Sequence, residues 1–210
     1  MRIGILGTGS MAEALGGGWV RAGHQVLVGG RDGRRAAALG ERIGAGSLRE
    51  AAEFGTGAVL VAVPYAVAEQ VVAELPLAGR TVVDCTNPVG EGFGLLTAGG
   101  PSAAERIAAA APGARVAKAF NRCHESVWRR NPPVFDGRPL AVPVCGDGEE
   151  AVAVVRQLVR GLGCEPVGAG GLGRAGLLEA TAALLIGLWI GEGADAQAIA
   201  PPLAFAGSSG

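Results

Sequence analysis

Residues 3–12 read Ile-Gly-Ile-Leu-Gly-Thr-Gly-Ser-Met-Ala, and this stretch decides the fold of the 210-residue chain. An apolar run leads directly into the spacing Gly7-x-Gly9-x-x-Ala12, and a segment that favours a helix follows. In dinucleotide-binding folds the first glycine permits a tight strand-to-helix turn, and the second lets the backbone approach a pyrophosphate. A small third residue lets the helix pack closely, with its N-terminus facing the phosphates. The opening therefore predicts a dinucleotide site.

Apolar runs recur along the rest of the chain with the rhythm of alternating strands and helices. Strands are expected at residues 2–6, 25–29, 58–63, 81–85, 115–119, 140–145 and 165–167. Helices are expected at residues 10–21, 34–43, 47–54, 66–74, 102–111 and 149–162. Unbroken runs of Val, Ile and Leu are typical of parallel strands that helices cover on both faces. The pattern predicts an α/β fold, namely a doubly wound, mainly parallel Rossmann sheet.

A small C-terminal helical element is expected after the sheet. Glycines cluster at residues 168–173, and residues 174–190 then favour a strongly apolar helix. We predict an NADP-binding Rossmann domain over residues 1–168, the helical element over 169–206 and a disordered tail over 207–210. The helix is apolar on nearly every face, which predicts a homodimer with Leu185 and Trp189 in its interface, or a rim of the substrate pocket.

The second strand indicates which dinucleotide binds. An NAD-binding domain places an acid about 20 residues beyond the glycine motif, but Gly30 stands there, and Asp32 is better placed as a helix N-cap. Guanidinium groups suit a 2′-phosphate, so NADP is favoured over NAD, with Gly30 leaving room. The arginines that cluster here also fit the first turn of an exposed helix: Arg31, Arg34 and Arg35.

Composition narrows the partners to small molecules. The formal net charge is −1 and the basic residues are otherwise dispersed, whereas nucleic-acid or anionic-membrane binding needs a basic patch. No metal-ligand spacing occurs. The four cysteines form no C-x-x-C pair, which favours a reducing, cytoplasmic location. Residues 182–190 are the most apolar stretch, shorter than the ~20 residues that cross a bilayer, and no leader precedes the first strand, so no membrane association is expected.

Three further strand ends carry side chains that suit the nicotinamide half of a cofactor. In a doubly wound sheet the carboxyl ends of the strands border one crevice, where proline and backbone groups can hold a flat ring and asparagines offer amide contacts. These ends supply Val63, Pro64 and Tyr65; Asn87 and Pro88; and Ala119 and Asn121. The glycine-rich and proline-rich residues 89–101 follow the second of these ends, either as a substrate loop or lid or as a surface insertion.

Taken together, these segments resemble the NADPH-dependent coenzyme F-420 reductase family, the deazaflavin:NADP oxidoreductases. The resemblance runs from the glycine turn through Pro143-Val144-Cys145-Gly146-Asp147 to the apolar tail. It implies a Rossmann domain with a small C-terminal element, dimerisation, and hydride exchange between NADP and the deazaflavin coenzyme F-420. The family's cofactor-binding positions correspond here to Thr8, Ser10, Met11, Arg31, Pro64, Asn87 and Asn121.

Ala12 stands where the motif has a third glycine, which the motif tolerates. Two departures bear on the substrate: Arg122-Cys123-His124-Glu125 follows Asn121, and the tail after Trp189 runs through Gly191-Glu192-Gly193 into an Ala- and Pro-rich end. Hydride transfer between stacked cofactors needs alignment rather than a side-chain acid, so His124 is either a proton donor or a structural hydrogen-bonding residue. A second hypothesis is reduction of a small imine or alkene with Tyr65, His124 and Glu125 as proton donors. A third is a non-catalytic NADP-binding sensor or scaffold.

Overall fold

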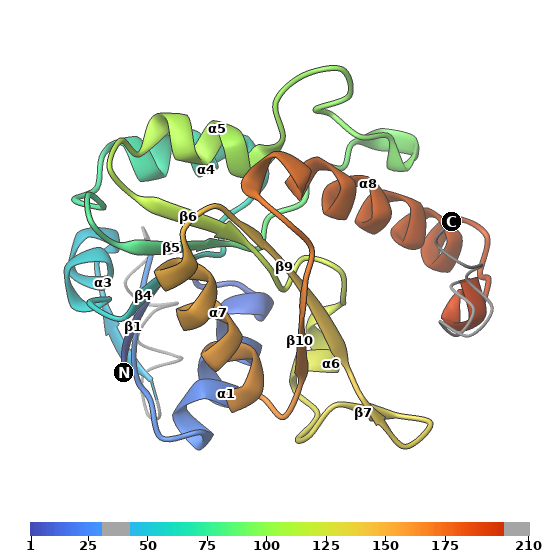
Figure 1. The fold of residues 1–210 in the computed structure, drawn as a ribbon, viewed down its shortest axis with the longest axis horizontal. Helices are drawn as coiled ribbons and strands as arrows, with labels where there is room; N and C mark the ends of the chain where they lie inside the picture. The colour runs from blue at the N-terminus through green and yellow to red at the C-terminus, as the bar shows by residue number, and fades with distance from the viewer. Residues whose placement is uncertain (31–42, 200–210) are drawn as a thin grey trace.

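The computed structural model describes residues 1–30 and 43–199. An eight-stranded sheet forms its centre, in the order β10-β9-β6-β5-β4-β1-β2-β3 (Figure 1). Its strands are β1 (Arg2–Leu6), β2 (Gln25–Gly29), β3 (Gly44–Gly46), β4 (Ala58–Val61), β5 (Thr81–Asp84), β6 (Arg115–Lys118), β9 (Ala141–Gly146) and β10 (Glu165–Gly168). From β3 to β6 all pairs are parallel, and only the β6–β9 pair is antiparallel. The predicted doubly wound, mainly parallel sheet is confirmed.

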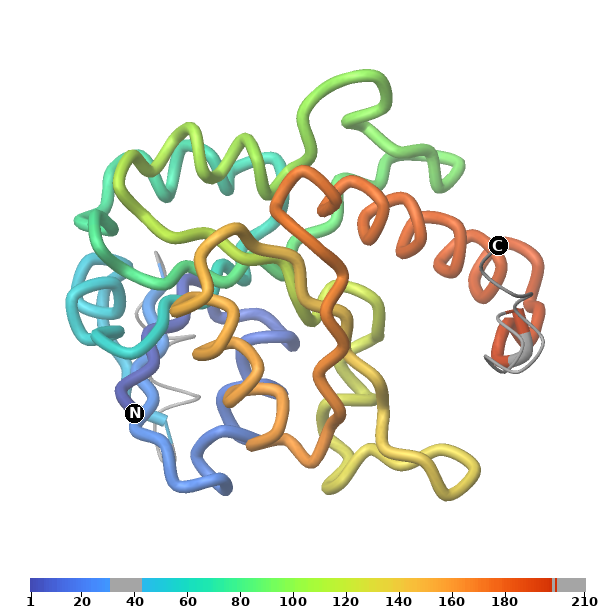
Figure 2. The backbone as a smooth tube through the Cα atoms, viewed as in Figure 1, coloured from blue at the N-terminus to red at the C-terminus, as the bar shows by residue number. Residues whose placement is uncertain are grey.

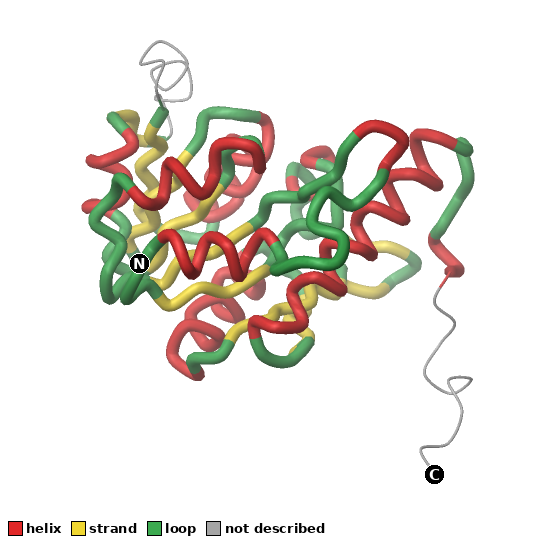
Figure 3. Tube along the Cα trace, turned by 90° about the horizontal axis from the view of Figure 1, so that it is seen from above, coloured by secondary structure: helices red, strands yellow, loops and turns green. Residues whose placement is uncertain are grey.

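Helices cover both faces of this sheet (Figures 1 and 3). One apolar core joins the strands to α1 (Ser10–Arg21), α6 (Glu125–Trp128) and α7 (Glu149–Gly161). The other joins them to α3 (Leu48–Phe54), α4 (Tyr65–Ala73), α5 (Ala103–Ala110) and α8 (Ala175–Ile186). Strand residues alternate between the two cores, because successive side chains of a strand point to opposite faces.

The N-terminal strand is buried on both faces. Ile3 and Ile5 are fully buried in the first core and Leu6 in the second. Gly4 lets α3 lie directly against the strand, since a Cβ atom there would be 1.9 Å from the carbonyl oxygen of Ala51. This close packing fixes the position of β1 and therefore of the glycine turn at its carboxyl end.

Several elements differ from the sequence-based expectation. β4 ends at Val61 rather than at residue 63, and the unpredicted strand β3 consists of glycine and alanine, which carry no strand signal. A hairpin of β7 (Val134–Phe135) and β8 (Arg138–Pro139) is too short to show a periodicity. Two predicted features lie wholly outside the described residues: the Asp32 cap and the tail at 207–210. The predicted helix at residues 34–43 lies outside them except for residue 43. The domain boundary at residue 168 stays a prediction.

The C-terminal helical run is longer than expected. η2 (Leu172–Arg174), α8 and the π-helical turn η3 (Gly187–Gly191) form one helical segment of 20 residues with a mean hydropathy of 1.4. By length and composition this segment could cross a membrane, so the expectation that no stretch is long enough was wrong. The segment begins against the second core and projects beyond the sheet (Figures 1 and 3).

The loop after β5 reaches this helical segment (Figure 2). It contains the short helix η1 (Glu91–Phe93), in which Phe93 has φ 62°. The Phe93 ring lies against two glycines one helical turn apart, because a Cβ atom at Gly191 would be 2.9 Å from Phe93 Cε2 and one at Gly187 would be 3.4 Å from Phe93 Cβ. The absence of side chains at these two positions makes room for the ring.

Candidate functional site

A cleft of about 490 Å³ lies beside the carboxyl ends of β1 and β4. In the strand order β3-β2-β1-β4-β5-β6, the direction of the sheet's winding reverses between these two strands. Open α/β sheets bind ligands at such a switch point, outside the carboxyl ends of the strands. The cleft is lined by Gly7, Thr8, Gly9, Ser10, Met11, Gly30, Leu48, Ala62, Val63, Pro64, Val67 and Val71.

Gly7 makes the turn that opens the cleft. Its φ is 124°, a conformation that side chains rarely adopt, and a Cβ atom there would be 2.3 Å from the carbonyl oxygen of Ala62. The Gly7 amide donates to the carbonyl oxygen of Gly29 at 2.8 Å, which ties the turn to β2. Residue 7 must therefore be glycine for both conformational and steric reasons.

Gly9 leaves space where a phosphate group would lie. It is the N-cap of α1, no side chain caps the helix, and a Cβ atom at this position would meet nothing within 4 Å. The first backbone amides of a helix lack intrahelical partners and attract anions. Ala12 is fully buried where the helix packs on the sheet. The turn thus has the geometry expected for a pyrophosphate-binding motif.

Thr8, as well as the predicted cofactor, leaves room only for a glycine at residue 30. A Cβ atom at residue 30 would be 2.5 Å from Thr8 Cγ2, so a larger residue would push the glycine turn. The arginines predicted to hold a 2′-phosphate, Arg31, Arg34 and Arg35, lie outside the described residues. The preference for NADP over NAD, which these arginines suggest, therefore stays a prediction.

The cleft brings together most of the predicted adenosine and pyrophosphate positions, together with Val63 and Pro64. Other predicted residues are not among its lining: Tyr65, Asn87, Pro88, Ala119 and Asn121. Sequence reasoning missed Leu48, Ala62, Val67 and Val71. The last two follow Pro64 at helical spacing, so they occupy the cleft side of α4, and this spacing was a usable signal.

Asn87 and Asn121 bind each other. Asn87 Nδ2 donates to the Asn121 carbonyl oxygen at 2.6 Å, and Asn121 Nδ2 donates to Asn87 Oδ1 at 3.0 Å. Asn121 Nδ2 also donates to the carbonyl oxygen of Leu178 in α8 at 3.1 Å. An amide group has two hydrogens, so Asn121 uses both within the protein. Its predicted contact with the nicotinamide would have to use its oxygen.

His124 lies at the protein surface with 68% of its side chain exposed. It is the N-cap of α6, its Nδ1 accepts from the Ser126 amide, and its Nε2 is 2.8 Å from Glu125 Oε2. These contacts are those of a structural cap. No contact in the described residues connects His124 to the cleft, and its role as a proton donor stays a prediction.

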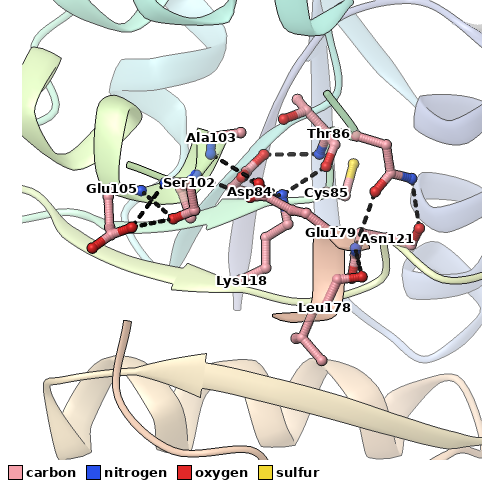
Figure 4. A network of polar contacts seen from close by, with 12 residues as sticks. Asp84, Cys85, Thr86, Ser102, Ala103, Glu105, Lys118, Asn121, Leu178 and Glu179 are labelled. Atoms are coloured by element: carbon pink, nitrogen blue, oxygen red, sulfur yellow. Dashed lines mark hydrogen bonds and ion pairs between the residues drawn. The ribbon is translucent and has the colours of Figure 1, made fainter. Parts of the chain in front are cut away.

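A buried charged cluster lies beside the asparagine pair (Figure 4). Lys118 Nζ is 2.7 Å from Asp84 Oδ2 and 3.0 Å from Glu179 Oε1, and all three side chains are fully buried. Burial acts to lower the pKa of Lys118, but the charges of Asp84 and Glu179 outweigh it and raise the pKa. Sequence reasoning gave these residues no role. The signal was present, because Glu179 is the single charged residue in the apolar sequence 175–191.

The sequence is similar to those of proteins described as oxidoreductases. Residues 2–88 match the model of a family described as NADP oxidoreductase, coenzyme F-420-dependent. The metalloreductase STEAP3 of Rattus norvegicus is 32% identical over 195 residues, which are 90% of this chain. The chain spans 38% of that protein's length.

Solved structures share the fold over nearly the whole chain. A protein of Arthrobacter sp. FB24, provisionally described as an F-420-dependent NADP reductase, superposes with a TM-score of 0.80 at 26% identity, covering 92% of this chain and 95% of that one. An imine reductase of Aspergillus terreus in complex with NADPH4 has a TM-score of 0.68 at 23% identity, covering 90% and 61%. The chain is thus similar in sequence and fold to proteins described as NADP-dependent oxidoreductases, and every described residue that lines the cleft falls within the matched residues 2–88.

Proposed function

We propose that this chain transfers a hydride between NADP(H) and the deazaflavin coenzyme F-420. The observation that carries the proposal is the cleft at the β1–β4 switch point, which combines a glycine turn, an uncapped helix N-terminus and open space at Gly9. The match of residues 2–88 and the end-to-end similarity to the Arthrobacter protein favour F-420 as the second substrate.

The chemistry of the cleft suits transfer between two cofactors. Among the residues that the structure describes, those lining the cleft carry no titratable side chain. Hydride transfer needs none, because the nicotinamide supplies the hydride and the deazaflavin ring accepts it. In this proposal the amides at the start of α1 bind the pyrophosphate and Arg31 binds the 2′-phosphate. Pro64 and the apolar residues of α4 hold the nicotinamide end and exclude water.

Mixing NADPH with oxidised coenzyme F-420 and following the visible absorbance of the deazaflavin tests this function. We expect turnover that requires both substrates, and none in a Gly9→Asp variant, whose carboxylate would occupy the phosphate position. Binding of NADPH without turnover of any acceptor would support the sensor hypothesis instead. Absence of NADPH binding would contradict the proposal as a whole.

Reduction of a small imine or alkene is the second candidate. Tyr65 begins α4 directly after Pro64, which lines the cleft, so a phenol hydroxyl lies close in sequence to the proposed nicotinamide position. An imine must be protonated as it accepts a hydride, and a tyrosine can serve as that acid. NADPH oxidation by a cyclic imine, lost in Tyr65→Phe, together with no reaction with the deazaflavin, would favour this candidate.

We further propose a homodimer in the cytoplasm. The outer side of the C-terminal helical run exposes Leu177 and Leu184, each 56%, and Trp189, 40%, and apolar faces of this kind pair with a second copy. In this arrangement α8 packs on its own domain and on a partner rather than in a bilayer, because Glu179 is fully buried against α5. The four cysteines are unpaired, which is consistent with the proposed cytoplasmic location, where disulfides are rare.

A further inference from the structure

The buried cluster of Asp84, Lys118 and Glu179 joins three separate elements of the fold. Asp84 and Lys118 end β5 and β6 and are register partners in the sheet. Two residues earlier, Val82 and Val116 belong to the core that contains α5 and α8. Because alternate strand residues share a face, the two charged side chains point toward the same helices, and Glu179 approaches them from α8.

Every donor of the lysine is used. Lys118 Nζ donates to Asp84 Oδ2 at 2.7 Å and to the Thr86 carbonyl oxygen at 2.6 Å, and lies 3.0 Å from Glu179 Oε1. An ammonium group has three hydrogens, so these partners satisfy it completely. The second carboxylate is balanced by a helix terminus, since Glu179 also accepts from the amides of Ala103 and Ala104 at the start of α5.

The cluster is bonded to the backbone on both sides of the asparagine pair. Thr86, whose carbonyl oxygen binds Lys118 and whose amide donates to Asp84 Oδ1 at 2.8 Å, directly precedes Asn87. Leu178, whose carbonyl oxygen accepts from Asn121 at 3.1 Å, directly precedes Glu179. The asparagines then bind each other. The hydrogen bonds and the chain together form a closed ring that connects the loop after β5, α8 and the loop after β6 (Figure 4).

A contribution to folding stability alone does not explain why this ring contains buried charges. Replacing a buried ion pair by apolar residues is often neutral or stabilising, so buried charges are weak evidence for stability and can instead specify one arrangement. Here the cluster is bonded to Thr86 and adjoins Leu178, which are the backbone neighbours of the asparagine pair at the carboxyl edge of the sheet.

We propose that Lys118 and Glu179 are positioning residues that fix Asn87 and Asn121, so that the nicotinamide half of NADP(H) depends on the cluster while the adenosine half does not. This rests on the proposed function. The adenosine half and the pyrophosphate are assigned to the glycine turn, where none of the three charged residues lies, whereas Asn87 and Asn121 are positions that the sequence predicts to contact the nicotinamide.

Glu179→Gln is the sharpest variant. It keeps the shape of the side chain and leaves the Asp84–Lys118 ion pair, but it replaces one of the two oxygens that accept from Ala103 and Ala104 by a donor. We expect the fold to be retained, and a thermal unfolding curve checks this. The matched control is Ser102→Ala, which removes the side-chain cap of the same helix α5 without touching the asparagine pair. A third variant, Asn121→Ala, removes the residue through which Glu179 is argued to act.

The binding experiment compares NADPH with 2′,5′-ADP, which contains only the adenosine half. For Glu179→Gln we expect the Kd for NADPH to rise about tenfold, the effect of one hydrogen bond to a charged group, while the Kd for 2′,5′-ADP changes by less than about twofold. Ser102→Ala should leave the Kd for NADPH and the Kd for 2′,5′-ADP unchanged. In the double variant with Asn121→Ala, the two losses should be less than additive. Equal losses for both ligands, or full additivity, would overturn the proposal.

A second measurement needs no ligand. Side-chain amide resonances of Asn87 and Asn121 in NMR spectra should shift and exchange faster with water in Glu179→Gln, and stay unchanged in Ser102→Ala. If Glu179→Gln leaves both asparagines as in the wild type, the positioning role is wrong. If the wild type binds neither ligand but the asparagine signals respond, the proposed function fails while the positioning of the asparagines stands.

Discussion

The methyl group of Thr8 lies where a side chain of residue 30 would begin, 2.5 Å from the position of a Cβ atom built on Gly30. Gly30→Ala should therefore destabilise the protein by about 1–3 kcal/mol, as overpacking does, and weaken NADPH binding by shifting the glycine turn. In a Thr8→Ser background the methyl group is absent, and the same change should cost much less. Urea unfolding of the four proteins measures this coupling. Equal costs in both backgrounds would show that the contact is unimportant.

Gly9→Asp should separate binding from stability. The new side chain enters open space, and aspartate is a favoured N-cap, so thermal stability should be unchanged or higher. Its charge would repel the pyrophosphate, and at ~4 Å such a pair near a protein surface interacts with about 4 kcal/mol. Calorimetry should show NADPH binding reduced at least a hundredfold.

The control for this prediction is Gly173→Asp in η2, another glycine at which a Cβ atom would meet nothing within 4 Å. It lies outside the cleft and should leave NADPH affinity unchanged. Similar losses in both variants would indicate an effect of net charge rather than a phosphate site at Gly9.

Arg31→Ala tests the choice of dinucleotide. A hydrogen bond to a charged group contributes about 1.5–3 kcal/mol, so NADPH affinity should fall by roughly that amount while NADH affinity changes little. Fluorescence titration with both cofactors measures the difference. If both affinities fall equally, Arg31 does not read the 2′-phosphate, and Arg34 and Arg35 become the residues to test.

The thiols should react slowly in the native protein. Burial raises the pKa of Cys85 and of Cys164 to about 12, and it also raises the pKa of Cys123 and Cys145. Only the thiolate is nucleophilic. At pH 8 a disulfide reagent should label the native protein slowly and all four thiols rapidly in guanidinium. Rapid native labelling assigned by mass spectrometry to Cys85 or Cys164 would contradict this.

The same raised pKa values determine a dependence of stability on pH. Below the unfolded-state thiol pKa of about 8.5, both states are protonated and the native state keeps its full stability. Above it the unfolded state loses protons that the native state retains, so stability falls as the pH rises toward 12. A Cys85→Ala, Cys164→Ala variant should show a smaller fall in its urea midpoint between pH 8.5 and 11.

Leu184→Glu tests the proposed homodimer. Leu184 is 56% exposed, so a charge there should not disturb the monomer but should prevent pairing of the apolar faces, giving a monomer in sedimentation velocity. Leu185, which the sequence suggested for this purpose, is 5% exposed and part of the monomer's own packing. Leu185→Glu should unfold the protein instead. A wild-type monomer at micromolar concentration would contradict the dimer.

The fold was predictable because the strands of a parallel sheet are unbroken apolar runs. Gly7 was predictable because it lies between a strand and a helix, where the turn needs a glycine. The strand β3 was not, because Gly44-Ala45-Gly46 has no side chains whose pattern could indicate it. In the cleft, Gly7, Gly9 and Pro64 were found because each follows a strand end. Leu48 reaches the cleft from the start of α3, which packs against β1 and β2, and no local pattern encodes this tertiary contact.

The charged cluster shows even more clearly that tertiary contacts cannot be predicted from local sequence patterns. Asp84 and Lys118 are 34 residues apart, and their pairing depends on the register of two neighbouring strands. Glu179 joins them only because α8 folds back against α5. A sequence shows that each residue is unusual in its apolar surroundings, but not that the three compensate one another.

The contact of Phe93 with Gly187 and Gly191 divides the excursion from β5 to α5 into two short spans. Holding a loop at an interior point lowers the number of conformations that its chain can adopt, and shorter spans lose less entropy on closure. The chain that leaves Asn87 is therefore restrained a few residues later by the far end of the C-terminal helical run. Backbone order at the edge of the crevice depends in this way on two positions that carry no side chain at all.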